Sequence, residues 1–294
     1  MTVTSILCPV DFSAHAERAL RYASALASLT GAHLTVLTVT EPLLDAAARA
    51  SGDHEKLHAQ TQEALAALLA RHAPAGHGTE PPAVAVVVGD PADAILAQAA
   101  ECDADVVVMG TQGLGGARKL LFGSTTERVL RRAAIPVLAV PEGADRIEAG
   151  PGGPRLSIER LLVPVDVVGP PPTHLETAGA WARLLGAAAR LLYVSPAFAA
   201  PAPWQVELGP VLDARRAEAA AALDALRARL GPDVPVECEV RAGKPSEQIA
   251  EAATAAGCGL IVLAPGRADR RPGATAYRVL CGADVPVLVA AGPA

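Results

Sequence analysis

The strongest constraint on this chain is that it repeats itself. Residues 5–11 (SILCPVD) are echoed by residues 160–166 (RLLVPVD), and residues 135–138 (IPVL) by residues 285–288 (VPVL). Between them, a Gly-Asp-Pro at positions 89–91 has a Gly-Lys-Pro counterpart at 243–245. Each half of the 294 residues is about the size of one domain. We therefore predict two tandem domains of the same fold, residues 1–143 and residues 158–294.

Each half has the pattern of an α/β domain. In the first half, apolar runs at residues 6–10, 33–39, 83–88, 106–109 and 136–140 alternate with alanine-rich helical stretches. Near-continuous apolar runs indicate strands that are buried on both faces, as in a parallel sheet. The fold class predicted for each half is a doubly wound five-stranded parallel sheet, order 3-2-1-4-5, with helices on both faces.

Capping residues place the first helices. Ser13 can cap a helix over residues 14–29, and Gly31 can end it. Asp90 followed by Pro91 predicts the start of a helix over residues 92–100.

The stretch 142–157 is rich in Gly, Pro and charge and suits a linker between the domains. A second loose stretch, 196–210, contains Trp204, whose role as a packed lid or as a contact point stays open.

Composition excludes several classes of protein. The net charge of −6, without blocks of like charge, disfavours nucleic acid as a partner. No apolar run is long enough to span a membrane and the start has no charged signal segment, so we expect no membrane partner and a cytoplasmic protein. Five cysteines without a C-x-x-C pair predict reduced thiols, with Cys8 as a core residue.

The motif that carries chemistry follows the fourth strand. It runs Gly110-x2-Gly113-x9-Gly123-Ser124, with Thr125 and Thr126 next. Gly110 allows a sharp turn off the strand, Gly113 close approach of a ligand, and Gly123 an open helix entrance. The amides and hydroxyls of residues 124–126 are expected to face outward at a helix N-terminus, where partial positive charge favours phosphate oxygens.

An aspartate completes this site if the first and fourth strands are neighbours. Asp11 would then end one strand beside Gly110 at the end of the other. In open α/β sheets ligands bind at this edge, where the winding direction reverses. Asp11 is placed to accept a hydrogen bond from a ribose hydroxyl, and the alternative is a turn or helix-capping aspartate.

These residues resemble the ATP-binding branch of the universal stress protein family. The resemblance rests on residues 9–13 (PVDFS), on the glycine motif and on residues 135–138, and it covers the first half throughout. It implies ATP, with or without Mg²⁺, and leaves AMP and cyclic AMP as alternatives. It also implies a set of nucleotide-binding residues: Pro9, Asp11, Val39, Met109, Gly110, Gly113, Gly123, Ser124, Thr125 and Thr126.

Two of the implied contacts have plain alternatives. Val39 would contact adenine through its backbone, which leaves no side-chain signature, so it can equally be a core valine at the end of a strand. Arg118 and Lys119 could neutralise phosphate charge or lie on a solvated loop.

The second half has lost most of the motif. Ala264 replaces the first glycine, Ala274 replaces the hydroxyl residue, and the connecting segment is about four residues shorter. Asp166 is kept, but one carboxylate cannot bind a triphosphate. We predict that this domain is degenerate and binds nucleotide weakly or not at all.

Other motifs point to enzymes that the rest of the chain does not support. Residues 54–58 (HEKLH) match H-E-x-x-H of zinc proteases, but no third ligand follows at a fitting distance, so a solvated helix face is favoured and no metal site is expected. The chain contains no P-loop and no G-x-S-x-G elbow.

Three functions remain open for this chain. A nucleotide-dependent stress sensor acting on an unknown protein partner is favoured, because no general base lies in the motif apart from Glu127, which should pair with Arg131. The alternatives are a slow ATPase or autophosphorylating enzyme and a scaffold with vestigial binding. In the family, domains pair through their last strands, so residues 136–140 should lie beside residues 286–290 about an internal pseudo-twofold axis. A further homodimer stays open.

Overall fold

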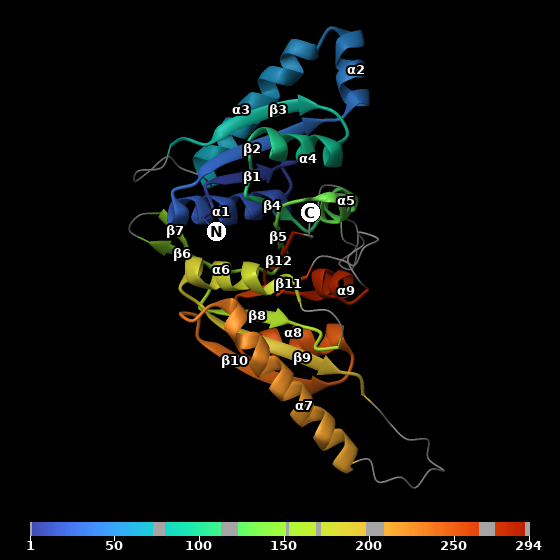
Figure 1. Cartoon of the computed structure of the whole chain (residues 1–294). Helices are drawn as coiled ribbons and strands as arrows, with labels where there is room; N and C mark the ends of the chain where they lie inside the picture. Colours follow the sequence, from blue (N-terminus) through green and yellow to red (C-terminus); the bar gives the residue numbers. More distant parts are fainter. Residues whose placement is uncertain are drawn as a thin grey trace, which may run out of the picture.

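A computed structural model shows the chain as an elongated molecule whose two halves meet in the middle (Figure 1). The structure describes residues 2–72, 80–112, 123–150, 153–168, 172–197, 209–264 and 274–291. The stretch containing Trp204 and the segment with Gly113, Arg118 and Lys119 lie outside the described residues.

Strands and helices alternate in both halves. The first half comprises β1 (Ser5–Pro9), α1 (Ala14–Thr30), β2 (His33–Thr40), α2 (Pro42–Ser51), α3 (His54–His72), β3 (Ala83–Val88), α4 (Pro91–Glu101), β4 (Val106–Gly110), α5 (Ser124–Arg132) and β5 (Val137–Val140). A connection follows with β6 (Ile147–Gly150) and β7 (Gly153–Leu156). The second half comprises β8 (Arg160–Pro164), α6 (Leu175–Leu185), β9 (Ala188–Ser195), α7 (Gly209–Arg227), η1 (Ala228–Leu230), β10 (Val236–Ala242), α8 (Pro245–Ala255), β11 (Leu260–Leu263), α9 (Ala274–Gly282) and β12 (Val287–Val289).

The main strands form one continuous sheet. Its order is β10-β9-β8-β11-β12-β5-β4-β1-β2-β3, so each half has the predicted order 3-2-1-4-5. All pairs within a half are parallel, whereas β5 and β12 pair antiparallel, with Leu138 opposite Leu288. This pairing confirms the expected internal pseudo-twofold arrangement, and it covers two sheet edges that would otherwise expose unpaired backbone groups.

The predicted capping residues act as expected. Ser13 is the N-cap of α1, where its Oγ accepts a hydrogen bond from the amide of Ala16, and Gly31 ends the helix with φ +73°. Asp90 caps α4 by accepting bonds from the amides of Ala92 and Asp93. Local capping chemistry therefore sets these boundaries without help from the rest of the fold.

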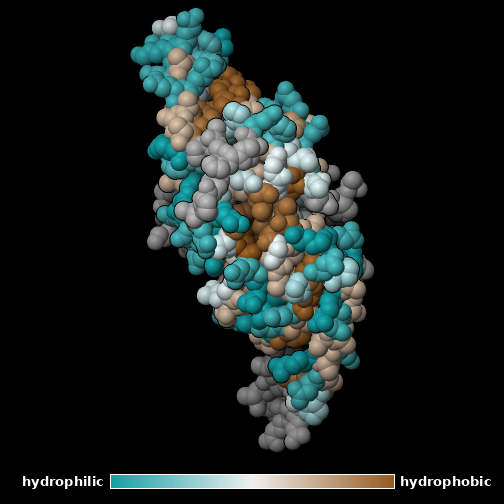
Figure 2. All heavy atoms as spheres, turned by 90° about the vertical axis from the view of Figure 1, so that its left-hand side faces the viewer, coloured by the Kyte–Doolittle hydropathy of each residue, from teal (hydrophilic) through white to brown (hydrophobic). Residues whose placement is uncertain are grey.

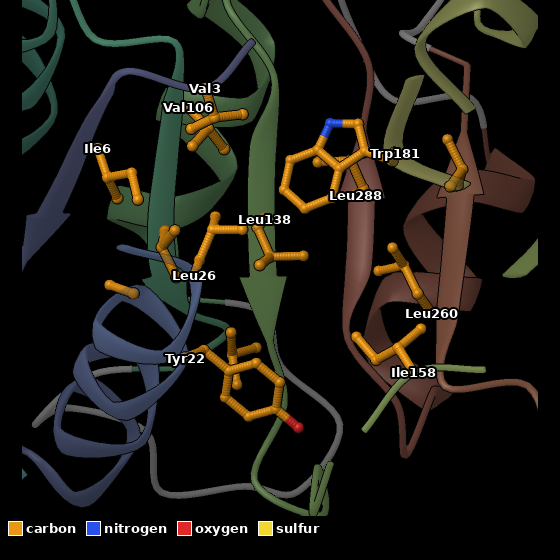
Figure 3. Close-up of a cluster of buried hydrophobic side chains, with 14 of the residues drawn as sticks. Val3, Ile6, Tyr22, Leu26, Val106, Leu138, Ile158, Trp181, Leu260 and Leu288 are labelled. Atoms are coloured by element: carbon orange, nitrogen blue, oxygen red, sulfur yellow. The ribbon is translucent and has the colours of Figure 1, made fainter. Parts of the chain in front are cut away.

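The core has two layers, one on each face of the sheet. Helices α1, α3, α6 and α7 cover one face, and α4, α5, α8 and α9 cover the other. Alternate strand residues point to opposite faces, and both layers run through the two halves without interruption. Figure 3 shows Leu138 and Leu288 facing each other where the halves meet, with Trp181 beside Leu288. On the side that lies left in Figure 1, hydrophobic atoms gather in the middle of the molecule and again just below its upper tip, which is itself mostly hydrophilic (Figure 2).

The connection between the halves is a folded hairpin that its composition did not predict. Strands β6 and β7 pair antiparallel and lie against α1. The amide of Arg146 donates to the Tyr22 hydroxyl at 2.9 Å, and Arg18 Nη1 donates to the carbonyl oxygen of Ala144 at 2.8 Å. Burial raises the pKa of Tyr22 to about 12, so this hydroxyl stays neutral. The hairpin thus fastens the connection to the first half.

The five cysteines fit the expectation of reduced thiols. All five cysteines are free, Cys8 is fully buried, and burial raises the pKa of its thiol, which fits a core residue. No helix within the described ranges is long and apolar enough to cross a bilayer.

Candidate functional site

The ends of β1, β2 and β4 meet at one edge of the first sheet. Pro9 of β1 pairs with Leu37 of β2, so continuing this register places Asp11 level with Val39. Strand β4 lies on the other side of β1, with Val106 opposite Ile6, which places Thr111 level with Asp11. Because the winding direction reverses between β1 and β4, this edge is where an open α/β sheet offers a ligand crevice.

Two hydrogen bonds bring the ends of the glycine motif together. The amide of Gly123 donates to the carbonyl oxygen of Thr111 at 2.8 Å, and the Thr126 hydroxyl donates to the carbonyl oxygen of Gly110 at 2.9 Å. The start of α5 is therefore held against the end of β4, close to the level of Asp11. The arrangement that the motif predicted, a helix N-terminus at this edge of the sheet, is present.

Helix α5 begins differently from α1 and α4. Its N-cap is Gly123, and no side chain caps the helix, whereas α1 and α4 begin with Ser13 and Asp90 as side-chain caps. Ser124 is exposed and Thr125 is partly exposed. The first-turn amides of an uncapped helix favour an anion, since the helix dipole adds to their hydrogen-bonding capacity.

Thr126 corrects one part of the sequence prediction. Its side chain is buried, and its hydroxyl donates to the backbone of Gly110 rather than facing outward with Ser124. The hydroxyl proton is already used, so it cannot be offered to a phosphate without breaking the bond that positions α5. Thr126 therefore supports the site by holding α5 in place.

The two motif glycines that the structure describes, Gly110 and Gly123, differ in how closely other atoms surround them. A Cβ on Gly110 would lie 3.0 Å from the backbone and Cβ of His15, so a larger residue would push α1 away from β4. This close approach of α1 explains the glycine, because Gly110, the last residue of β4, has no positive φ that would itself favour glycine. A Cβ on Gly123 would meet protein atoms at 3.4 Å and beyond, which is ordinary contact, and its φ is −62°. Packing against the described residues therefore does not require glycine at 123.

Asp11 takes part in the turn between β1 and α1. Its Oδ1 accepts hydrogen bonds from the amide and hydroxyl of Ser13, at 3.1 and 2.6 Å, and Phe12 between them has φ +62°. In the second half, Asp166 Oδ1 accepts from the amide of Val168 at 2.9 Å in the same way. The turn alone thus accounts for an aspartate in both halves, and it also fixes the orientation of the Asp11 carboxylate.

The apolar members of the predicted set lie on the strands that form this edge. Pro9 ends β1 and is partly exposed, and Met109 is buried near the end of β4. Val39 lies in β2 and packs its partly buried side chain on the core below α4 and α5. Its side chain therefore has the role of a plain core valine, which leaves its backbone as the part that could contact a ligand.

His15 is a residue that sequence reasoning missed. It lies in the first turn of α1, against Gly110, and its Nδ1 is buried without a hydrogen-bond partner among the described residues. The motif itself contains no histidine, and the tertiary structure brings this one to it. The available signal was its position four residues after the strand-end aspartate.

The second half differs at the same edge of its sheet. Helix α6 has 11 residues before its terminal Gly186, whereas α1 has 17 before Gly31. In the sequence, prolines 170–172 align with the first turn of α1, and α6 begins at Leu175. The segment 265–273, which corresponds to the glycine motif, lies outside the described residues.

The H-E-x-x-H match lies far from this edge. His54 begins α3, and its Nδ1 lies 3.1 Å from Asp45 Oδ1 of α2, while His58 is exposed. Across the ranges that the structure describes, no group of three or more His, Cys, Asp or Glu residues could hold a metal ion. Glu127 pairs with Arg131 at 3.9 Å, as expected for residues one turn apart.

Comparisons with known proteins agree with this architecture. A model of the universal stress protein family matches residues 2–141 and 157–291. A universal stress protein of Thermus aquaticus, encoded in the 3′ region of a QAH/OAS sulfhydrylase gene, is 36% identical over 136 residues, which are 46% of this chain and 97% of the relative. Among solved structures, the protein PA1789 of Pseudomonas aeruginosa, described as functionally unknown, has a TM-score of 0.62 at 20% identity and covers 98% of this chain and 92% of its own. A universal stress protein of Archaeoglobus fulgidus has a TM-score of 0.59 at 18% identity, covering 99% and 97%.

Proposed function

Because this chain belongs to the universal stress protein family, as two copies of the family's domain, we propose that its first half binds an adenine nucleotide and acts as a nucleotide-dependent stress sensor. Residues 1–143 form the binding domain in this proposal, and residues 158–294 form a degenerate domain with weak or no binding. ATP is the proposed ligand, with or without Mg²⁺. The phosphates would lie on the first turn of α5 and the ribose near Asp11.

The observation that carries this proposal is the uncapped start of α5 at the strand edge that bears Asp11. The bonds from Gly123 to Thr111 and from Thr126 to Gly110 keep this start in place without a ligand. Room for a methyl group at Gly123 gives a second reason, since glycine there is explained if a phosphate approaches the backbone. The residues proposed to bind phosphate are thus Gly123, Ser124 and Thr125, with Thr126 supporting them.

For the protein to act as a sensor, a bound nucleotide must change a surface that a partner protein contacts. The segment from Thr111 to Gly123 connects the end of β4 to the phosphate site, so a bound nucleotide would contact both of its ends. ATP would thereby alter the surface at this edge of the sheet. The proposed protein partner is one whose binding to this surface depends on whether the nucleotide is bound.

Calorimetry with ATP, AMP and cyclic AMP tests binding, and the repeat supplies a matched control. Asp11→Ala and Asp166→Ala remove the same turn aspartate from the two halves. We expect Asp11→Ala to lower ATP affinity by about tenfold or more, the value of one hydrogen bond to a charged group. Asp166→Ala should leave it unchanged. No heat with any of the three nucleotides would reduce the first half to a structural role.

The glycines provide a second and independent test of the same site. Gly123→Ala should reduce ATP affinity about tenfold but change the free energy of unfolding by no more than about 1 kcal/mol, since a methyl group fits there within the protein. Gly110→Ala should lower stability as well, because its methyl group meets the backbone of α1. Equal ATP affinity for wild type and Gly123→Ala would contradict phosphate binding at this helix start.

One observation favours the alternative of a slow ATPase or autophosphorylating enzyme. Turnover needs a group that takes up a proton, and the imidazole of His15 lies on the helix that contacts Gly110. A turnover assay separates the two functions: release of γ-phosphate that is lost in both His15→Ala and Ser124→Ala would establish an enzyme. Binding without release of phosphate is the result that the sensor requires.

A further inference from the structure

The second half contains a groove that takes no part in the proposed nucleotide site. It lies between α8 and the turn that joins α9 to β12, with a volume of about 430 Å³. Helices α8 and α9 lie next to each other on the same face of the sheet (Figure 1). The residues that define its shape and charge are Ala250, Glu251, Ala253, Ile261, Gly282 and Asp284.

The internal repeat shows why this groove exists. Aligning Pro245 with Pro91 places Ala250 where α4 has Leu96, and aligning Pro286 with Pro136 places Gly282 where α5 has Arg132. In the first half, Leu96 packs on the core, and Arg132 forms an ion pair with Asp93 of α4. Two large side chains of this helix pair, one on the core and one in an ion pair, are thus replaced by a methyl group and a hydrogen atom.

The ion pairs that join the two helices also differ between the halves. In the first half, Arg128 Nη1 lies 2.7 Å from Asp90 Oδ2 and joins α5 to α4. The aligned residues in the second half are Arg278 and Lys244, which have like charges, and Lys244 instead pairs with Glu247 of its own helix at 3.0 Å. Without that link, α8 and α9 enclose a groove that opens to solvent.

Carboxylates mark the rim of the groove. Glu251 and Asp284 are both exposed, and they stand where the first half has Ala97 and Ala134. Glu251 accepts a hydrogen bond from Gln248 Nε2 at 2.8 Å, which holds its side chain on α8. Among the described residues, no lysine or arginine lines the groove. Its floor is apolar, formed by alanines and Ile261, and its rim is negative.

We propose that this groove binds a small amphipathic cation, a primary alkylamine, with its hydrocarbon chain on the floor and its ammonium group at Glu251 and Asp284. The volume is within the range of small-molecule sites, and burial of an alkyl chain supplies the attraction that exposed charges alone do not. The same carboxylates repel phosphates, so this ligand is distinct from the nucleotide of the first half. The second half has lost a site for anions and carries one for cations.

An NMR titration of the full-length protein with n-hexylamine tests the site, with hexanoate and n-hexanol as probes of equal chain length. Hexylamine should bind at least tenfold more tightly than either and shift signals of α8 and of residues 282–285. Binding of hexanoate at equal strength, or no binding of hexylamine, would overturn the proposal.

Variants taken from the chain's own first half complete the test. Ala250→Leu, which restores the larger residue of α4, should abolish hexylamine binding. Glu251→Ala and Asp284→Ala remove exposed carboxylates and should each weaken it severalfold without a change in thermal stability. If Ala250→Leu unfolds the protein, the two carboxylate variants still decide the matter, since unchanged hexylamine affinity in both would overturn the assignment. Nucleotide binding by the first half is measured in parallel and should not change in any of them.

Discussion

Replacing Gly179 with alanine is expected to destabilise the protein by about 3 kcal/mol or more, as for severe overpacking. A Cβ at this position of α6 would lie 2.0 Å from the carbonyl oxygen of Leu230 and 2.7 Å from its carbonyl carbon. These are backbone atoms of η1, and Arg183 Nη1 holds the same carbonyl oxygen at 2.8 Å. The helix and η1 must therefore separate to admit a methyl group.

The sign of this effect separates tertiary packing from helix propensity. Propensity alone predicts that alanine stabilises a helix by about 1 kcal/mol relative to glycine. Chemical denaturation of Gly179→Ala measures the free energy of unfolding, and Gly209→Ala in α7 serves as the control, because a Cβ at Gly209 meets no atom within 4 Å. A stabilised Gly179→Ala variant would show that η1 moves freely and that its contact with α6 contributes little.

Acidification should destabilise the protein through His174, with a loss that approaches about 3 kcal/mol between neutral pH and pH 4. Burial in the second half, together with the nearby charge of Arg229, lowers the pKa of His174 to about 4. Its Nε2 donates to the carbonyl oxygen of Pro164 at 3.0 Å, which requires a proton on that nitrogen, and its Nδ1 has no partner among the described residues. The ring is therefore buried in the neutral form.

The direction follows from where the proton binds. Between pH 6.5, the usual pKa of histidine, and pH 4, the unfolded chain binds a proton that the folded protein does not. The free energy of unfolding therefore falls as the pH falls through this window, and below about pH 4 the loss is complete because both states are protonated. Each pH unit within the window is worth about 1.4 kcal/mol.

Comparison of denaturation midpoints at pH 7, 6, 5 and 4 isolates this contribution from that of the carboxylates. His174→Gln keeps a neutral hydrogen-bond donor but cannot be protonated, so its stability should vary less with pH than that of the wild type. His58→Gln changes an exposed histidine and should leave the pH dependence as it is. Identical pH profiles for wild type and His174→Gln would mean that the buried ring is not the titrating group.

Both large effects arise in the half that has diverged most from the nucleotide-binding pattern. Helix α6 begins at Leu175, has 11 residues where α1 has 17, and has His174 as its N-cap residue. The second half thus keeps the sheet and its pairing with the first half, while its helices have acquired close contacts and a groove of their own.

The amino-acid sequence by itself determined the fold class and the tandem repeat, whereas the pairing of the last strands was expected from the resemblance to the universal stress protein family. Continuous apolar runs indicated strands that are buried on both faces. Ser13, Gly31 and Asp90 indicated helix ends, where they form local hydrogen bonds. The spacing of Gly110, Gly123 and Ser124 predicted a helix start at the end of β4. The apolar runs, the helix caps and the glycine spacing depend on residues that are close in sequence, and the repeat follows from comparing the two halves.

Only the tertiary structure decided which polar atoms already have hydrogen-bond partners and which distant residues are in contact. Thr126 reads like Ser124 in the sequence, but its hydroxyl bonds to Gly110, 16 residues away, and His15 meets that same glycine from another helix. Gly179 looks like a weak helix residue until Leu230 is seen against it, and the groove of the second half results from small residues on two separate helices. The physical reason is the same in each case: close packing and hydrogen bonding join residues that are distant in the chain, and no local pattern records the distance between them.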